Sequence, residues 1–347
     1  MGRVVLVTGV AGDLGRRCAR RLADASGVDR VVGVDVVPPR SDIGAMQFVR
    51  ADIRNPVIAK IIVREHVDTV VHLSVASHTA AGGRNTTKEL NVIGTMQLLA
   101  ACQQAPELRH LVVKSSTAVY GASNRDPAMF REETPPGRAP TGGFAKDVTE
   151  VEGYVRGFGR RRPDVRVTTL RMANVLGPDL GSPLTAYFGL PLIPTVLGFD
   201  PRLQFLHEED ALAGLEHAVT ADVPGTFNVA GDGVLMLSQA IRRLGRPPLP
   251  LPAFALSGFG SAVRQARMAD FSAGQVAFLT YGRGVDTSRM RTGLGFEPAY
   301  DTETAFDSLA RSLAPGVLRA SRVRAVEHGL AGALPHAGAV GREQVRG

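Results

Sequence analysis

The amino-acid sequence predicts an α/β fold, with a doubly wound parallel sheet in its N-terminal half and a smaller C-terminal α/β lobe. Three observations predict it. Short valine-rich runs alternate with helical patterns over the first 170 residues. The runs show no regular change between polar and apolar residues, which is typical of strands covered on both faces. From about residue 177 the pattern changes to short pieces separated by prolines.

The predicted strands follow one another at regular intervals. They cover residues 4–7, 31–34, 69–73, 111–113 and 165–170. The helix after the first strand places Leu14, Cys18 and Leu22 on one face, where they would pack on the sheet. We therefore expect residues 1–176 to form the first domain.

The second half of the chain is divided by prolines at 178, 183, 191, 194 and 201. Helices are predicted near 209–220 and 238–244, and two more helical stretches follow a second proline cluster at 247–252. Residues 177–315 are expected to form the smaller lobe. Residues 316–347, rich in Ala, Gly and Arg without a sustained period, are expected to be a loosely ordered tail.

Composition excludes several classes of protein. The 347 residues are 44% hydrophobic, enough for a full core. Two cysteines cannot form a disulfide framework or a Cys-rich metal site, so Cys18 and Cys102 are expected to be reduced core residues and no metal is predicted. The net charge of +7 comes from 40 basic residues scattered among 33 acidic ones, and the basic runs lack interleaved aromatics, so no nucleic acid is expected.

No membrane partner is expected either. The sequence has no apolar stretch of about 18 uncharged residues, and its N-terminus enters a strand without a basic and apolar leader. These features favour a cytoplasmic protein.

A glycine-rich turn after the first strand predicts a dinucleotide site. In the segment TGVAGDLG at 8–15, Gly9 permits a tight turn, Gly12 lets the backbone approach a pyrophosphate, and Gly15 lets helix and strand pack closely. The start of the helix, at Asp13 and Leu14, offers free N–H groups to phosphate. The first domain is therefore expected to be a Rossmann-type unit.

Asp35 predicts NAD as the cofactor in preference to NADP. It ends the second strand, 20 residues after Gly15, where a carboxylate accepts hydrogen bonds from ribose hydroxyls and repels a 2′-phosphate. Two alternatives stay open. Asp35 could be a solvated turn residue before Pro38, and Arg30 and Arg40 could bind the 2′-phosphate of NADP.

With these residues placed, residues 3–312 resemble the extended short-chain dehydrogenase/reductase family, which includes UDP-glucose 4-epimerases and nucleotide-sugar dehydratases. The markers are TGVAGDLG at 8–15, Asp35, ADI at 51–53, VVHLS at 70–74, ELNVIGT at 89–95, SSTAVYG at 115–121, Lys146, LRMANVLGP at 170–178, FLHEEDAL at 205–212 and DTSRMRTGLGFEP at 286–298. The resemblance implies an NAD-dependent nucleotide-sugar epimerase or dehydratase, most similar to UDP-sugar 4-epimerases. It also implies a substrate-binding second lobe interleaved with the first domain.

The resemblance implies roles for residues beyond the glycine turn. Asp52 and Ile53 would flank the adenine, Leu73 and Ser74 would line the nicotinamide side, and Asn91 would lie near the cofactor. Asn91 has an alternative role as the cap of a helical turn.

The remaining implied roles concern the substrate. Ser116 matches a catalytic serine or threonine that binds the reacting hydroxyl, and Asn174 matches a substrate-binding asparagine. Lys146 matches a catalytic lysine that holds the nicotinamide ribose and lowers the pKa of the tyrosine phenol. Ser116 could instead satisfy backbone groups at a strand end, and His72 and His207 are expected to be packed polar residues.

One residue of the family pattern is missing. Gly142 stands four residues before Lys146, where the family carries the tyrosine that accepts the hydroxyl proton, and no tyrosine lies between Tyr120 and Tyr154. Loss of a general base lowers a rate by about 10²–10⁴. Three outcomes stay open: an enzyme with another proton acceptor, such as a substrate group, His207 or a glutamate of the second lobe; a non-sugar NAD oxidoreductase; or an NAD-binding sensor or interaction protein without turnover.

The evidence for the substrate is also indirect. The family often holds the nucleotide diphosphate with an arginine just before a segment like FLHEED. Here Leu203 occupies that position and Arg202 is displaced by one residue. A UDP-sugar is the predicted partner, and a homodimer through the helices near 86–105 and 145–160 is expected by resemblance alone.

Overall fold

The computed structural model describes residues 2–75, 83–137, 139–255 and 272–316. Its centre is a parallel sheet of seven strands in the order β11-β6-β5-β4-β1-β2-β3. The strands are β1 (Arg3–Thr8), β2 (Val28–Asp35), β3 (Gln47–Arg50), β4 (Thr69–His72), β5 (His110–Ser116), β6 (Arg166–Met172) and β11 (Gly225–Val229). All five predicted strands are present, and the α/β fold class is confirmed.

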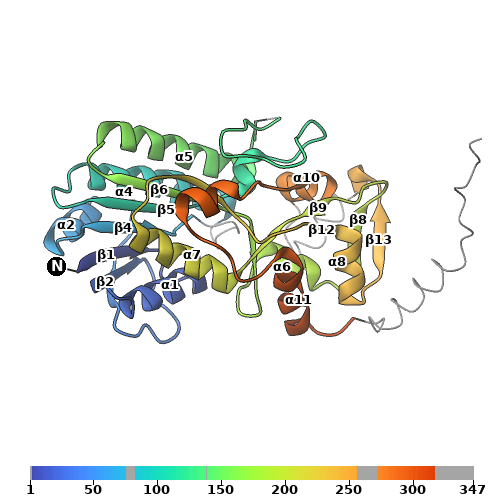
Figure 1. Ribbon diagram of the computed structural model, residues 1–347, viewed down its shortest axis with the longest axis horizontal. Coiled ribbons are helices and arrows are strands. Elements are labelled where there is room, and N and C mark those ends of the chain that lie inside the picture. Colours follow the sequence, from blue (N-terminus) through green and yellow to red (C-terminus); the bar gives the residue numbers. More distant parts are fainter. Residues whose placement is uncertain (1, 76–82, 138, 256–271, 317–347) are drawn as a thin grey trace, which may run out of the picture.

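Helices cover both faces of this sheet, as the unbroken valine runs predicted (Figure 1). One face carries α2 (Val57–Arg64), α4 (Gly94–Gln103) and α5 (Gly143–Arg161), and the other carries α1 (Asp13–Ala23) and α7 (Glu208–Ala221). A short helix α3 (Gly83–Lys88) and a π-helical turn (Glu89–Ile93) lead into α4. Cys18 and Cys102 are both buried in this core.

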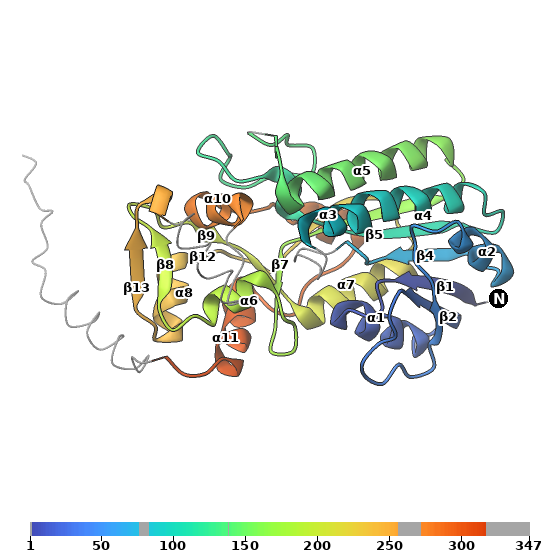
Figure 2. The ribbon, with the colours of Figure 1, turned by 180° about the vertical axis from the view of Figure 1, so that it is seen from behind.

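The second lobe consists of small sheets and short helices (Figures 1 and 2). Its strands are β7 (Asn174–Leu176), β8 (Ile193–Val196), β9 (Arg202–Leu203), β10 (Phe205–His207), β12 (Leu235–Met236), β13 (Pro248–Leu251) and β14 (Gly282–Arg283). Its helices are α6 (Pro183–Phe188), α8 (Leu237–Leu244), α10 (Ala273–Tyr281) and α11 (Thr302–Ser312). The helices predicted near 209–220 and 238–244 correspond to α7 and α8.

Two hydrophobic clusters form the interior, and they interleave in sequence. The first surrounds the large sheet and includes Phe227 of β11 and Met290, Leu294 and Phe296 from a π-helical turn (Met290–Leu294) and the residues after it. The second lies in the smaller lobe and runs from Leu176 to Leu309. The chain therefore returns to the first cluster after residue 177, while the division at 176 stays a prediction. The predicted tail lies almost wholly outside the described residues.

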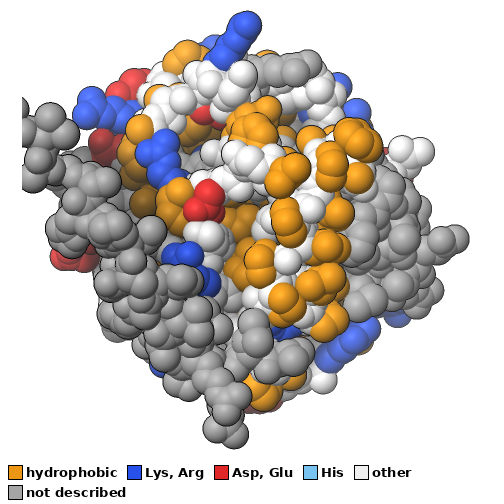
Figure 3. Space-filling model, turned by 90° about the vertical axis from the view of Figure 1, so that its right-hand side faces the viewer, with side chains coloured by type: hydrophobic (Ala, Val, Ile, Leu, Met, Phe, Trp, Pro, Cys, Tyr) orange, Lys and Arg blue, Asp and Glu red, His pale blue; other side chains and the backbone are white. Residues whose placement is uncertain are grey.

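The far end of the smaller lobe exposes apolar side chains. Leu192, Leu197, Phe199, Phe254 and Tyr281 are each at least 38% exposed. Figure 3 looks onto this end of the molecule and shows hydrophobic side chains gathered there. Surfaces of this kind are typical of contacts with other molecules. In the described parts of the chain, no helix combines the length and apolar character needed to cross a membrane.

Candidate functional site

A cleft of about 1040 Å³ opens at the carboxyl ends of the central strands. The strand order reverses between β1 and β4, and ligands of open α/β sheets bind at such a switch point. The glycine turn and the ends of β2, β4 and β5 form one side of the cleft. Residues 180–184, Ser272, Gly274, Gln275 and Arg283 of the second lobe close it from the other side.

The glycine turn has the backbone geometry that a pyrophosphate site needs. Gly9 has a φ of +81°, and a Cβ on it would lie 2.9 Å from the backbone nitrogen of Ser74. A Cβ on Gly15 would lie 2.1 Å from the Gly9 carbonyl oxygen, so only glycine permits this packing of β1 against α1. A Cβ on Gly12 would lie 3.5 Å from the same oxygen, which is ordinary contact. Gly12 precedes α1, and no side chain caps the start of this helix, so its first N–H groups are left facing the cleft.

Asp35 is held beside the glycine turn. Its carboxylate accepts hydrogen bonds from the backbone N–H of Ala11 at 2.9 Å and of Val36 at 2.7 Å, and it lines the cleft. Each carboxylate oxygen keeps a second acceptor position for a ribose hydroxyl. Arg30, an alternative partner for a 2′-phosphate, instead pairs with Glu65 at 2.8 Å, whereas Arg40 does line the cleft.

Four more of the predicted cofactor residues lie in the same cleft: Asp52, Ile53, Leu73 and Ser74. Arg54 binds the carboxylate of Asp52 at 2.6 Å, and these hydrogen bonds lower the pKa of Asp52. Three acidic residues line the cleft, Asp13, Asp35 and Asp52, and they lie at the end of it that is nearest to β2 and β3.

Ser116 and Asn174 lie at the other end of the cleft, beyond β4. Ser116 ends β5, and its hydroxyl accepts a hydrogen bond from the backbone N–H of Ala118 at 3.1 Å, which leaves its proton free to donate. Ser115 points to the opposite face of β5 and donates to Glu152 at 2.6 Å.

The start of α5 departs most from the predicted arrangement. Gly142 lines the cleft, and a Cβ added to it would meet no atom within 4 Å. Lys146 does not line the cleft. Its side chain is 44% exposed, and its amine lies 3.8 Å from Glu150, one turn further along the helix.

Asn91 is brought near α5 but not into the cleft. It is fully buried in the π-helical turn, and its amide donates to Asp147 at 3.2 Å. The structure thus joins the glycine turn, the acidic residues, Ser116 and Asn174 around one cavity, and places Asn91 and Lys146 outside its lining.

Comparison with known proteins identifies the family. Residues 5–230, about two thirds of the chain, match the model of the NAD dependent epimerase/dehydratase family. The chain belongs to this family. The match confirms the predicted resemblance and the prediction of NAD as the cofactor, and the glycine turn with Asp35 fits that cofactor.

Individual relatives agree with this assignment. An uncharacterized protein of Mycobacterium tuberculosis is 49% identical over 332 residues, which are 94% of this chain and 88% of the relative. A UDP-glucuronic acid 4-epimerase from Bacillus cereus, solved with UDP-glucuronic acid and NAD, has a TM-score of 0.69 at 18% identity, covering 89% of this chain and 98% of its own. A dTDP-glucose 4,6-dehydratase from Streptomyces venezuelae, solved with NAD, also has a TM-score of 0.69, at 21% identity over 89% of this chain and 96% of its own. At these identities the structures establish the shared fold.

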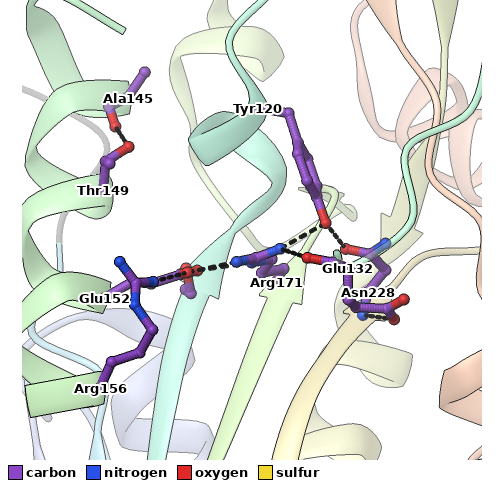
Figure 4. A network of polar contacts seen from close by, with 9 residues as sticks. Tyr120, Glu132, Ala145, Thr149, Glu152, Arg156, Arg171 and Asn228 are labelled. Atoms are coloured by element: carbon purple, nitrogen blue, oxygen red, sulfur yellow. Dashed lines mark hydrogen bonds and ion pairs between the residues drawn. The ribbon is translucent and has the colours of Figure 1, made fainter. Parts of the chain in front are cut away.

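No tyrosine of the described chain takes the place left by Gly142 in this family member. The Tyr120 hydroxyl donates to Asn228 and accepts from Arg171, both at 2.8 Å, in a buried network that continues to Glu152 (Figure 4). Burial raises the pKa of Tyr120, so its phenol is a poor base. Tyr154 is absent from the cleft lining and 40% exposed.

The histidines also lie outside the cleft lining, as packed polar residues. His72 sits between the hydroxyls of Thr8 and Thr95, 2.8 Å from each, and burial lowers its pKa to about 4. His207 accepts from the backbone N–H of Glu209 at the start of α7.

Two cationic residues of the cleft were not predicted from the sequence. Lys114 on β5 and Arg283 on β14 both line it. Burial lowers the pKa of Lys114 to about 8 and that of Arg283 to about 10. Among the described residues, neither forms an ion pair with a carboxylate. For Lys114 a sequence signal did exist, because it stands two residues before Ser116 and so on the same face of the strand.

Proposed function

We propose that this protein is an NAD-dependent epimerase or dehydratase relative that acts on a nucleotide sugar in the cytoplasm, and specifically a 4-epimerase of a UDP-sugar. One observation carries the proposal. The cleft that holds the dinucleotide turn continues to Ser116 and to the half-buried guanidinium of Arg283, which forms no salt bridge in the described chain, although the charge of Asp126 acts on it. When bound, NAD accepts and returns a hydride at the sugar end of this cleft.

Arg283 has the setting of an anion-binding group. Its Nε donates to the carbonyl of Gly121 at 2.7 Å, and its guanidinium lies over the ring of Phe278 at 5.2 Å. These contacts fix the plane of the guanidinium and leave its outer N–H groups available. A planar guanidinium held in this way suits bidentate binding of phosphate.

The position of Arg283 accounts for the absence of an arginine at residue 203. β14 pairs with β9 so that Arg283 stands directly beside Leu203, whose side chain is fully buried. Arg202 is exposed and does not line the cleft. We propose that Arg283, one strand over, takes the diphosphate that the family's arginine binds.

The alternative is an NAD-binding sensor without turnover, which the vacancy at Gly142 favours. A non-sugar NAD oxidoreductase is less well supported, because a neutral alcohol has no anionic group that Arg283 could bind. Dimerisation through α4 and α5 stays a prediction.

The test begins with mass spectrometry of nucleotides and sugars that copurify with the protein. UDP-glucose and UDP-galactose are then supplied to the NAD-loaded protein, and their interconversion is followed by NMR. We expect interconversion, and we expect Arg283→Leu to raise the KM for the UDP-sugar while NAD binding is kept. Arg202→Leu is the matched control. NAD binding without binding or turnover of any nucleotide sugar would favour the sensor.

A further inference from the structure

Lys114 lies at the end of the cleft that holds Ser116 and Asn174, which we call the reactive end. Successive residues of a strand face opposite sides, so Lys114 and Ser116 share one face of β5, while Ser115 faces α5 and binds Glu152. Lys114, Ser115 and Ser116 all line the cleft, and of the two hydroxyls that of Ser115 is engaged by Glu152. The amine therefore opens toward the same space as the hydroxyl that would bind the reacting alcohol.

Among the described residues that line the cleft, the groups able to hold a proton are few. There is no tyrosine, histidine, cysteine or glutamate. The three aspartates, Asp13, Asp35 and Asp52, belong to the end beyond β1, where the adenosine is expected. Lys114 is the one remaining side chain that can change its protonation near neutral pH, because a guanidinium such as that of Arg283 stays protonated.

The groups around Lys114 leave its charge uncompensated. On β4, His72 is buried and neutral near pH 7, and the Lys114 charge adds to the burial that lowers its pKa. From the second lobe, Arg283 adds a further positive charge to the cleft.

The acidic residues on neighbouring elements are engaged elsewhere. On α7, Glu208 pairs with Arg17 at 3.0 Å, and Asp210 accepts from the backbone N–H groups of Ala299 and Tyr300. On the far face of β5, Glu152 is held by Arg171.

We propose that Lys114 is the proton acceptor of this enzyme, in place of the tyrosine that Gly142 replaces. The inference rests on the proposed function. The neutral amine takes the proton of the substrate hydroxyl that Ser116 positions, the carbon–oxygen bond becomes a carbonyl, and the hydrogen on that carbon leaves with its electron pair as hydride to NAD⁺. In the return step the ammonium gives the proton back, so no other oxidant or reductant is needed.

The open space at Gly142 is part of this arrangement. Apart from the neighbouring residues of the chain, no atom lies within 4 Å of the position where its Cβ would stand, and Gly142 itself lines the cleft. A sugar ring or a water molecule can occupy the volume that a tyrosine ring would fill.

The test compares four proteins loaded with NAD: the wild type, Lys114→Met, Lys114→Arg, and the control Lys60→Met, in which an exposed lysine of α2 is changed. Formation of reduced nicotinamide on mixing with UDP-glucose or UDP-galactose is measured in a single turnover across pH. We expect the wild-type rate to rise with pH and level off above about 8, because the neutral amine is the base. Lys114→Met should be slower by about 10²–10⁴ with NAD affinity unchanged, and Lys60→Met should match the wild type.

Lys114→Arg separates the two roles a lysine can have. Arginine keeps the positive charge but cannot lose its proton, so it should be as slow as the methionine variant. A Lys114→Arg protein with the wild-type rate would overturn the proposal, because the side chain would then act as a cation only. Loss of transfer in Lys146→Met together with retention in Lys114→Met would overturn it as well.

A second measurement does not depend on turnover. Amine acylation is followed by mass spectrometry as a function of pH, with NAD present. Lys114 should react with a midpoint near pH 8, below the ordinary lysine value of about 10.4, and a UDP-sugar should protect it while leaving the exposed Lys60 reactive.

These outcomes distinguish the two proposals. If NAD binds and no nucleotide sugar reacts with the wild type, the proposed function fails, and Lys114 is judged by its acylation. A midpoint at the ordinary lysine value, or Lys114 unprotected by the ligands, then overturns its assignment as well. A midpoint near pH 8 supports it as the base of the cleft toward another alcohol.

Discussion

Replacing Gly12 and Gly15, one at a time, separates the effect of the turn on cofactor binding from its effect on folding. In Gly15→Ala the new Cβ would lie 2.1 Å from the Gly9 carbonyl oxygen and 2.7 Å from its carbon, whereas ordinary contact begins at 3.4 Å. Both partners are backbone, so α1 must move away from β1 by about 1 Å. In Gly12→Ala the same oxygen lies at 3.5 Å, and the apo protein has room for the methyl group.

The magnitudes follow from these distances. Forcing a methyl group into packed structure costs about 1–3 kcal/mol, so Gly15→Ala should lower the Tm of the NAD-free protein by several degrees. Gly12→Ala should leave that Tm within about 1 °C. Its methyl group instead stands where the pyrophosphate must approach the backbone. NAD at a hundred times its Kd stabilises the wild type by about 2.7 kcal/mol, and this gain should vanish in Gly12→Ala.

The assay is thermal unfolding with and without NAD, combined with calorimetric measurement of NAD affinity. A Gly12→Ala protein that binds NAD as tightly as the wild type would refute the placement of the pyrophosphate on this turn. A Gly15→Ala protein with the wild-type Tm would refute the reading of the β1–α1 contact.

Three further predictions concern the reactive end and the core. Gly142→Tyr should keep the Tm, because a Cβ there meets nothing within 4 Å outside its chain neighbours, but it should not raise the rate of hydride transfer, because Lys114 already supplies the base and the ring would fill space left for the sugar; a rate raised tenfold or more in single-turnover measurements would count against Lys114 as the base. His72 should lower stability in acid. Its folded pKa of about 4 lies below the unfolded 6.5, so the unfolded chain binds the proton first, and up to about 3 kcal/mol should be lost between pH 6.5 and 4. His72→Gln should flatten that slope in urea titrations, and an unaltered slope would contradict this. Arg171→Met leaves the buried Glu152 without its main partner and should cost about 3–5 kcal/mol by urea unfolding, whereas Arg156→Met, 62% exposed, should cost less than about 1.

The parts of the molecule that the sequence predicts are those set by local pattern. The five inner strands were found because each is a short apolar run, and the glycine turn with Asp35 was found because backbone geometry restricts residue type at fixed spacing. β3 and β11 were missed. β3 has only four residues, QFVR, two of them exposed, and β11 follows the proline-rich segments from which no strand was expected. Edge strands depend on their neighbours for burial, and that information is not local.

The reactive end was less predictable because side-chain direction depends on where α5 begins. The resemblance to the family implied that Lys146 lies beside the cofactor. The helix starts at Gly143, and Lys146 pairs with Glu150 along its surface. The role of Lys114 was not predicted, because in the sequence it only interrupts an apolar run. Its amine reaches the cleft because β5 pairs between β4 and β6.

The two unpaired cations bear on whether the protein turns over a substrate. Burying a charge without a partner destabilises a fold, and Lys114 and Arg283, which are half-buried and form no salt bridge in the described chain, both carry part of that penalty in the ligand-free state. An anionic substrate that reaches both groups offsets it. We therefore expect Lys114→Met to raise the Tm of the ligand-free protein while removing hydride transfer, the pattern of a residue kept for chemistry at the expense of stability. The measurement is thermal unfolding of the two proteins freed of nucleotides. A lower Tm in Lys114→Met would mean that the lysine stabilises the fold, and it would contradict the inference that its charge is uncompensated and kept for catalysis.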